Sequence, residues 1–240
     1  MVINDTTNRT GIVQLLEDLT STQSASSSSY TLATKIRDIN LAFDDYQNMV
    51  QQASGTWQAD DSRHTKYPNM YFNLKSGQSD YNFTEDEQRN QVQDIYRVGC
   101  MDSNGKWTLL KAIDEMRETD AIGAIEIQSG TPTEYWKTAN GIFLKVKSNY
   151  SQTNGIRMFF TRSPNYFTTA NTTEEPGIPN GHHRYLALKP AFWYWLPKDT
   201  SRANIFFAEL QKVELEIKNE YSQRTRDEVA RLGVKQESNR

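Results

Sequence analysis

The spacing of apolar residues changes twice along this chain of 240 residues, and no other feature restricts its fold as much. Near both ends, apolar residues recur every three or four positions, which is the repeat of an amphipathic helix. Between residues 56 and 162 they alternate with polar residues, which is the repeat of a half-buried strand. We therefore expect an α+β fold, with N-terminal and C-terminal helices packed around a central antiparallel β-sandwich or small barrel.

Residues 1–55 are predicted to form two helices. The first begins after Asn4–Thr10, a polar cluster that offers several N-cap oxygens, and a Ser/Thr-rich connector follows at residues 20–29. The second has apolar residues in alternating steps of four and three: Leu32, Ile36, Ile39, Phe43, Tyr46 and Val50. This stripe packs either on the body of the same subunit or against a neighbouring subunit.

Residues 56–162 are predicted to form the β region. Two Asn-Gly pairs, Asn104-Gly105 and Asn140-Gly141, are strong signals for hairpins. Connections this short favour antiparallel neighbours. A short helix is expected at residues 111–117. Inward-facing residues are predicted from the alternation at either end of the region: Met70, Phe72, Leu74, Ile156, Met158 and Phe160.

Residues 163–181 are predicted to be a long loop, and residues 182–232 to form two helices that share one domain with residues 1–55. The helix at 182–196 contains Pro190, which is expected to kink or split it because proline lacks a backbone donor. Residues 233–240 are a polar tail. The last helix has one apolar stripe: Phe206, Leu210, Val213, Ile217 and Tyr221. Weak ion pairs are predicted on its polar side: Glu214–Lys218, Glu220–Arg224 and Asp227–Arg231.

Composition restricts the classes of function. The net charge of −3 lacks the cationic excess that phosphate neutralisation requires. No apolar run approaches the ~20 residues that span a bilayer, and the first residues lack the basic and apolar regions of a secretory signal. Cys100 is the single cysteine, so neither an internal disulfide nor a multi-cysteine metal site is expected. These features fit assembly in a reducing cytoplasm.

The chain holds few groups suited to catalysis, and no Gly-rich phosphate loop or nucleophile motif occurs. Asp60, Asp61 and His64 are types that bind metals, but a polar loop is the simpler interpretation because no clear third ligand is present. Asp102-x-Asn104-Gly105 has its glycine too early for a calcium loop. Four glutamates are interpreted as solvated surface: Glu115, Glu118, Glu126 and Glu134. We expect no enzyme activity, no metal and no cofactor.

Histidines and aromatic residues leave alternatives open. Of the adjacent His182 and His183, one is expected to pack under the preceding loop and the other to be exposed, and nothing specific favours a pH switch. Tyr135 and Trp136 fit an ordinary strand as well as a sugar-stacking site. The block Phe192–Trp195 points all round a helix and must be enclosed, either by the core of the subunit or by a neighbouring subunit.

Short sequence blocks that carry a family resemblance are spread over nearly the whole chain: Ile3–Asn8, Trp57–Ser62 with His64-Thr65, Ser76–Phe83, Thr131–Tyr135, Arg162–Phe167, His182–Leu188 and Tyr221–Arg224. On these blocks the chain resembles the head-to-tail adaptor (neck or connector) proteins of tailed bacteriophages, and more narrowly virion proteins common among marine phages. The large β region distinguishes it from the simplest all-helical adaptors, so the resemblance does not separate a portal-proximal adaptor from a tail-proximal or neck protein.

The resemblance implies a non-enzymatic subunit of a ring, usually of twelve copies, beneath the portal protein of the virion. Such a ring extends the DNA channel, through which double-stranded DNA passes without specific recognition, and presents a surface to the tail or the next neck protein. It implies assembly in the host bacterial cytoplasm and no membrane contact. Family members commonly contact the portal through a C-terminal segment, which corresponds here to residues 221–240.

A closed ring requires two different faces of each subunit to meet. We predict that the last two helices supply part of that contact and of the portal contact. The candidate residues are His183, Tyr185, Phe192, Trp193, Trp195, Phe206, Tyr221, Arg224, Arg226 and Arg231. The alternative function is a tail- or baseplate-associated β-sandwich that binds carbohydrate, through Trp57 or Trp136, or another tail protein. A virion-associated hydrolase is the third hypothesis.

Overall fold

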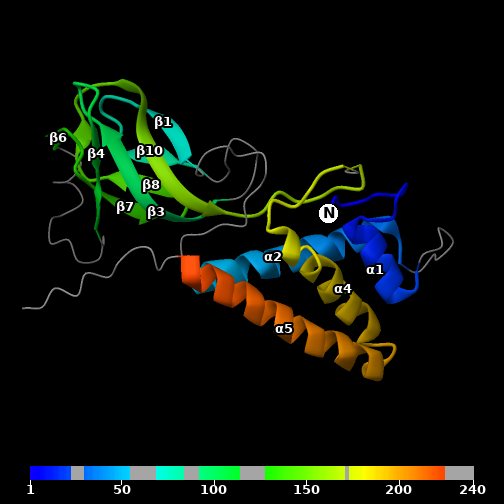
Figure 1. Ribbon diagram of the computed structural model, residues 1–240. Coiled ribbons are helices and arrows are strands. Elements are labelled where there is room, and N and C mark those ends of the chain that lie inside the picture. The colour runs from blue at the N-terminus through cyan, green and yellow to red at the C-terminus, as the bar shows by residue number, and fades with distance from the viewer. Residues whose placement is uncertain (23–29, 55–68, 84–91, 114–127, 171–172, 225–240) are drawn as a thin grey trace, which may run out of the picture. The chain divides into compact units, whose positions relative to one another are not determined.

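The computed structural model describes residues 1–22, 30–54, 69–83, 92–113, 128–170 and 173–224, apart from the side chains of residues 54, 69 and 224. Its helices and mainly antiparallel sheets confirm the α+β class. The chain forms two compact units (Figure 1). The helical unit combines Met1–Ala59 with Phe167–Arg240, and the β-unit is Asp60–Tyr166.

Segments from both ends of the chain build the helical unit. Its helices are α1 (Ile12–Thr20), α2 (Leu32–Ser54), α4 (Tyr185–Trp195) and α5 (Thr200–Arg224), and the short 3₁₀ turn η2 (Asn180–His182) precedes α4. Helix α4 packs against α1, α2 and α5. In Figure 1, α4 (yellow) and α5 (orange) are joined by a short turn. The two halves of this unit are therefore held together by α4 and by the packing of α5 on α2.

The apolar stripes predicted for α2 and α5 form the core of this unit. Ile39, Tyr46 and Val50 of α2 have no exposed surface, so the α2 stripe packs on the body of its own subunit. On α5, the predicted stripe is buried from Leu210 to Tyr221, while Phe206 is half-buried. The 3.6-residue repeat is thus satisfied within one unit.

Helix α1 begins after Asn4–Thr10 as predicted, but its predicted side-chain cap is wrong, and so is a split of α4 at Pro190. Helix α1 has Gly11 at its N-cap and no side-chain cap, because the Asp5 carboxylate instead accepts the backbone N–H groups of Thr7 and Asn8. Helix α4 continues through Pro190 and is not split. Pro190 is buried, and packing of the surrounding helices holds α4 in one piece.

Ion pairs of α5 connect helices as well as neighbouring turns. Glu214 contacts Lys189 of α4 at 3.3 Å, where the sequence predicted Lys218. Glu220 contacts His182 at 3.0 Å. The predicted partner of Glu220 and the pair Asp227–Arg231 lie outside the described side chains. Sequence spacing identified residues that form ion pairs, but the α4–α5 packing supplied their partners.

The described residues of the β-unit form two four-stranded sheets. Sheet A has the order β1 (Asn69–Leu74), β10 (Gln152–Arg162), β3 (Val92–Met101), β4 (Trp107–Leu109). Sheet B has the order β2 (Asp80–Asn82), β8 (Gly141–Leu144), β7 (Glu134–Thr138), β5 (Lys111–Ala112). A third, two-stranded sheet pairs β6 (Ser129–Gly130) with β9 (Lys147–Ser148). Pairing is not purely antiparallel, because β5 with β7 and β6 with β9 are parallel.

Both four-stranded sheets contribute to one core, as in a sandwich. Sheet A supplies Val98, Ile156 and Met158, and sheet B supplies Ile142 and Leu144, all with no exposed surface. Among the strands described here, neither sheet closes into a barrel. The alternating residues of the sequence therefore predicted the inner face of the sandwich.

The turns of the β-unit follow the Asn-Gly signals. Gly105 lies between β3 and β4 with φ 80°, and the Asp102 carboxylate accepts the backbone N–H of Asn104, which confirms a hairpin. Asn140 lies in the turn between the paired strands β7 and β8. The predicted helix at 111–117 is wrong at its start, because Lys111–Ala112 is a strand paired with β7. Residues 114–117 lie outside the described part of the chain.

Candidate interaction surfaces

Helix α5 has two apolar stripes, although the sequence predicted one. The buried stripe faces the core. On the opposite side, Ile205, Ala208 and Leu215 repeat at helical spacing, and Ile205 and Leu215 are 70% and 60% exposed. We call these three residues the outer stripe. The sequence does contain this second set of apolar positions, which alternate along the chain with the residues of the core stripe.

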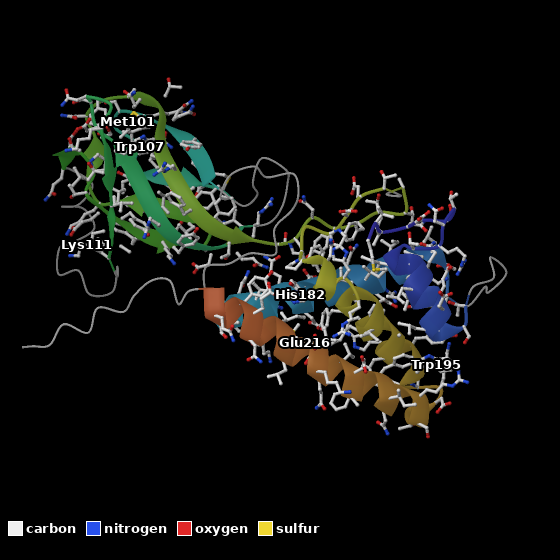
Figure 2. All side chains as sticks on the ribbon, in the orientation of Figure 1. Met101, Trp107, Lys111, His182, Trp195 and Glu216 are labelled. Atoms are coloured by element: carbon white, nitrogen blue, oxygen red, sulfur yellow. The ribbon has the colours of Figure 1, made fainter. Side chains whose placement is uncertain are left out.

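The turn between α4 and α5 gathers aromatic rings and cations. Lys198 Nζ lies 3.3 Å from the ring centroid of Tyr194, and the Arg202 guanidinium lies 4.5 Å from that of Trp195. The Trp195 indole N–H donates to the Leu19 carbonyl at 3.0 Å, which ties this end of α4 to α1. Figure 2 shows Trp195 at this end of the helical unit. The aromatic block is thus half-buried by its own subunit.

Ion pairs fix α4 along the length of α5. Arg184 contacts Glu216 at 2.7 Å and Glu209 at 3.9 Å. Lys189 contacts Glu214 on α5 and Asp45 on α2 at 3.6 Å. These pairs are partly exposed, so each adds little stability, but together they set the register between the helices. Figure 2 labels Glu216 on α5 and His182 near the start of α4.

The predicted contact residues divide into three groups. His183, Tyr185 and Tyr221 are at most 2% exposed, so they cannot touch a second protein unless the helical unit opens. This corrects their predicted role from direct contact to support of the core. Arg226, Arg231 and the side chain of Arg224 lie outside the described residues. Four others remain half-buried near the α4–α5 turn: Phe192, Trp193, Trp195 and Phe206.

A buried polar network joins three segments of the helical unit. His182 Nε2 lies 3.0 Å from the Glu220 carboxylate, and its Nδ1 lies 2.7 Å from the Tyr46 hydroxyl. The Tyr46 and Tyr221 hydroxyls form a hydrogen bond at 3.2 Å. This network anchors the C-terminal end of α5 to α2 and to the turn before α4. The prediction that one of the two histidines is exposed is wrong, because both are buried.

His183 is held as a neutral imidazole. Its Nε2 donates to the Ile178 carbonyl at 3.0 Å, and its Nδ1 accepts from the Met1 amino group at 2.8 Å. Burial is the largest cause that lowers the pKa of His183 below its ordinary value of 6.5. The ring therefore binds fewer protons in the folded chain than in the unfolded chain at mildly acidic pH.

We expect the stability of the helical unit to fall as the pH drops below 6.5. The contribution of His183 is fully present above its unfolded pKa and is lost as the pH falls toward the lowered folded pKa, with a slope of at most about 1.4 kcal/mol per pH unit. Denaturant unfolding at pH 7.5 and pH 5.5 measures this change. His183→Gln, which keeps a donor and an acceptor, should flatten the slope, and an unchanged slope would refute the assignment.

Asp5 titrates in a separate range. The backbone N–H of Asn8 is the largest cause that lowers the pKa of Asp5 to about 2. Its contribution is therefore present above its unfolded pKa of 3.8 and is lost only as the pH falls toward 2. The loss of stability below pH 6.5 can thus be measured without interference from this carboxylate.

The candidate catalytic and metal residues have no common site among the described residues. Burial raises the pKa of the Cys100 thiol to about 11, so it is protonated and inert at neutral pH. Glu134 contacts Lys145 at 3.2 Å and Lys111 at 3.4 Å, and these partners lower its pKa. No described group of three His, Cys, Asp or Glu side chains is arranged to hold a metal. The predictions at Asp60, Asp61, His64, Glu115, Glu118 and Glu126 lie outside the described residues.

Two of the residues considered for sugar binding, Tyr135 and Trp136, are buried. Tyr135 lies in the core of the sandwich, and Trp136 is only 6% exposed, because its ring stacks on Phe143 at a centroid distance of 4.4 Å. Trp57 lies outside the described residues. A cavity of about 250 Å³ beside β1 and β2 contains polar side chains, but Asn73 and Gln78 already bond to the backbone of Asn154 and Asp80.

No family model matches the sequence, and no curated protein matches it either. Within the described residues, every helix is too short or too polar to cross a membrane. Functional assignment therefore depends on the surfaces of the two units.

Proposed function

We propose that this chain is a structural adaptor subunit of a tailed-phage neck. In this role, copies of the chain form a ring beneath the portal protein, extend the DNA channel and join the head to the tail. The outer stripe of α5 carries this proposal, because it is an apolar helix face that the core of the subunit does not need. The sequence blocks that resemble phage adaptors supply the class of assembly.

A helix that is apolar on two opposite faces is typical of one covered on both sides. Ile205 and Leu215 together leave a large apolar area in water, and burying such a side chain stabilises a contact by roughly 1.5–3 kcal/mol. Lys212 lies between them on the same side of α5, and its ammonium group is 4.0 Å from the Glu209 carboxylate. The outer stripe therefore combines exposed apolar side chains with one charged pair, as protein interfaces often do.

The occupant we propose for the outer stripe is a second copy of the chain. A ring needs two different faces per subunit, and the helical unit exposes a second apolar set at the α4–α5 turn. There Leu196 is 51% exposed and Phe207 is 47% exposed, with Phe207 packed on Phe192 at a centroid distance of 5.8 Å. One copy's outer stripe and the next copy's Leu196 and Phe207 are the two faces of the proposed ring contact.

Assembly with the portal protein of the same virion tests this proposal. The wild-type chain mixed with portal rings should form a stoichiometric complex with a closed ring of this chain, visible by electron microscopy and by mass. Ile205→Ser combined with Leu215→Ser should lower ring formation at least tenfold, since losing two apolar contacts removes more than the 1.4 kcal/mol that corresponds to a factor of ten.

Leu41→Ser is the matched control, since Leu41 of α2 is a similarly exposed leucine (49%) that belongs to neither proposed ring face. Equal assembly by the double variant and the control would refute the ring contact.

The portal contact is tested by a truncation after Arg224. The chain is not cut before Tyr221, because Tyr221 is part of the core. Unchanged portal binding by that truncation would refute the predicted role of Arg226, Arg231 and their neighbours.

A further inference from the structure

The outer face of sheet A presents arginines among aromatic side chains. Strand pairing places Tyr71 opposite Arg157, Arg157 opposite Gly99, and Gly99 opposite Leu109, so these positions form one row across the sheet. Figure 2 labels Trp107 in this unit. We call the following set the arginine–aromatic face: Tyr71, Arg97, Trp107, Leu109, Arg157 and Phe159.

Two aromatic rings hold the Arg157 side chain in place. Its guanidinium carbon lies 5.1 Å from the ring centroid of Trp107 and 4.8 Å from that of Phe159. Gly99 lies beside these rings, and a Cβ at that position would meet the Trp107 ring at an ordinary contact distance of 3.5 Å. Tyr71 meets Trp107 edge-on at 6.3 Å. The planar group is therefore pre-oriented before any ligand arrives.

The cations on this face lack carboxylate partners. Neither Arg157 nor Arg97 forms an ion pair with any residue in the described ranges, and the buried Nε of Arg157 has no hydrogen-bond partner there. Arg97 is exposed and lies opposite Phe159. Asp94, an acidic residue of the same strand, is paired with Lys137 at 2.7 Å. The face thus offers several N–H donors and no matching acceptor.

We propose that the arginine–aromatic face binds an extended acidic segment of a partner protein. Arg157 is opposite Gly99, and Arg97 is two residues from Gly99 along the same strand, so the two arginines are diagonal neighbours about 7–8 Å apart at Cα. In an extended peptide, residues i and i+2 point to the same side at nearly the same spacing. A Glu-x-Glu segment therefore places one carboxylate at each arginine.

The flanks of the face suit apolar residues on either side of the acidic pair. Tyr71 is 43% exposed and Leu109 is 56% exposed, at the two ends of the row that contains Arg157.

A nucleic acid would fit the arginine–aromatic face less well than an acidic peptide. Two arginines neutralise only two phosphates, and Arg157 already covers ring faces of Trp107 and Phe159 that bases need for stacking.

Binding of labelled peptides to the full chain tests this inference, and it does not depend on ring assembly. The probe is a fluorescein-labelled peptide with the core Leu-Glu-Ser-Glu-Leu, and the matched peptide has Gln in place of both Glu residues. Fluorescence anisotropy should show saturable binding of the acidic peptide alone. Arg157→Gln and Arg97→Gln should each weaken it about tenfold, which corresponds to the loss of one charge-assisted hydrogen-bonded pair.

Lys106→Gln is the control for general charge, because Lys106 is exposed in the β3–β4 turn, and it should change binding by no more than about twofold. Arg97 is exposed and forms no ion pair within the described ranges, so its variant keeps the test valid if Arg157→Gln unfolds. Three results would overturn the inference. These are absent binding, equal binding of the Gln peptide, or tighter binding of single-stranded oligothymidine that depends on Arg157.

Discussion

Gly141→Ala is expected to destabilise the β-unit by about 3 kcal/mol, which is the upper range for overpacking a well-packed site. Gly141 begins β8 opposite Asn82, where β2 and β8 approach closely. A Cβ there would overlap the carbonyl oxygen of Tyr81 and lie 3.0 Å from the Asn82 Cα. These are backbone atoms, so β2 must move away and sheet B loses the edge strand that covers its core.

Hydrogen exchange measured peptide by peptide gives the readout, since it reports each unit separately. Amides of β2 and β8 should exchange faster in the variant, while those of the α5 core should not change. Gly130→Ala is the control, because a Cβ at Gly130 meets only Val146 at an ordinary 3.7 Å. Equal protection of β2 in both variants would show that the sheet can absorb the extra atom.

Tyr221→Ala is expected to destabilise the helical unit by roughly 3–5 kcal/mol, the range for truncating a buried aromatic ring. Tyr221 is 2% exposed, packs edge-on against Tyr46 at a centroid distance of 6.3 Å and shares a hydrogen bond with its hydroxyl. Tyr221→Phe removes only the hydrogen bond and should cost about 1 kcal/mol. Denaturant unfolding of the two variants separates the ring from the hydroxyl.

The same pair of variants separates structural support from direct contact. Tyr221→Phe keeps the fold, so its binding to the portal should equal that of the wild type if the residue acts only through the core. A large loss of portal binding by a stably folded Tyr221→Phe would show that the hydroxyl contacts a partner. The interface prediction made from the sequence would then be restored at this position.

The sequence predicted the parts of the fold that depend on local repeats. The stripe of α2 and the inner residues of β10 could be read from periodicity, because each follows the geometry of a single element. The Asn-Gly turns could also be predicted, because they depend only on residues adjacent in the sequence. The strand at Lys111–Ala112 was missed, because its pairing with Glu134 and Tyr135 joins segments distant in the sequence. Continuity of α4 through Pro190 depends likewise on neighbouring helices.

The candidate surfaces were only partly predictable. The aromatic residues of α4 were recognised, but their exposure was not, since Trp195 reaches the Leu19 carbonyl of a distant helix. The outer stripe of α5 was overlooked because the core stripe alone was enough to predict a helix at these residues. Arg157 gave no signal at all in the sequence. Its significance appears only when strand pairing places it between rings from β4 and β10.

The helical unit is discontinuous in the chain, and this has a consequence for synthesis. Tyr46 bonds to residues 136 and 175 positions further along, so the core of α1 and α2 has no partner while the β-unit is being translated. The β-unit can fold first, as an independent body on the ribosome. We expect the helical unit to remain incomplete until α5 has emerged from the ribosome.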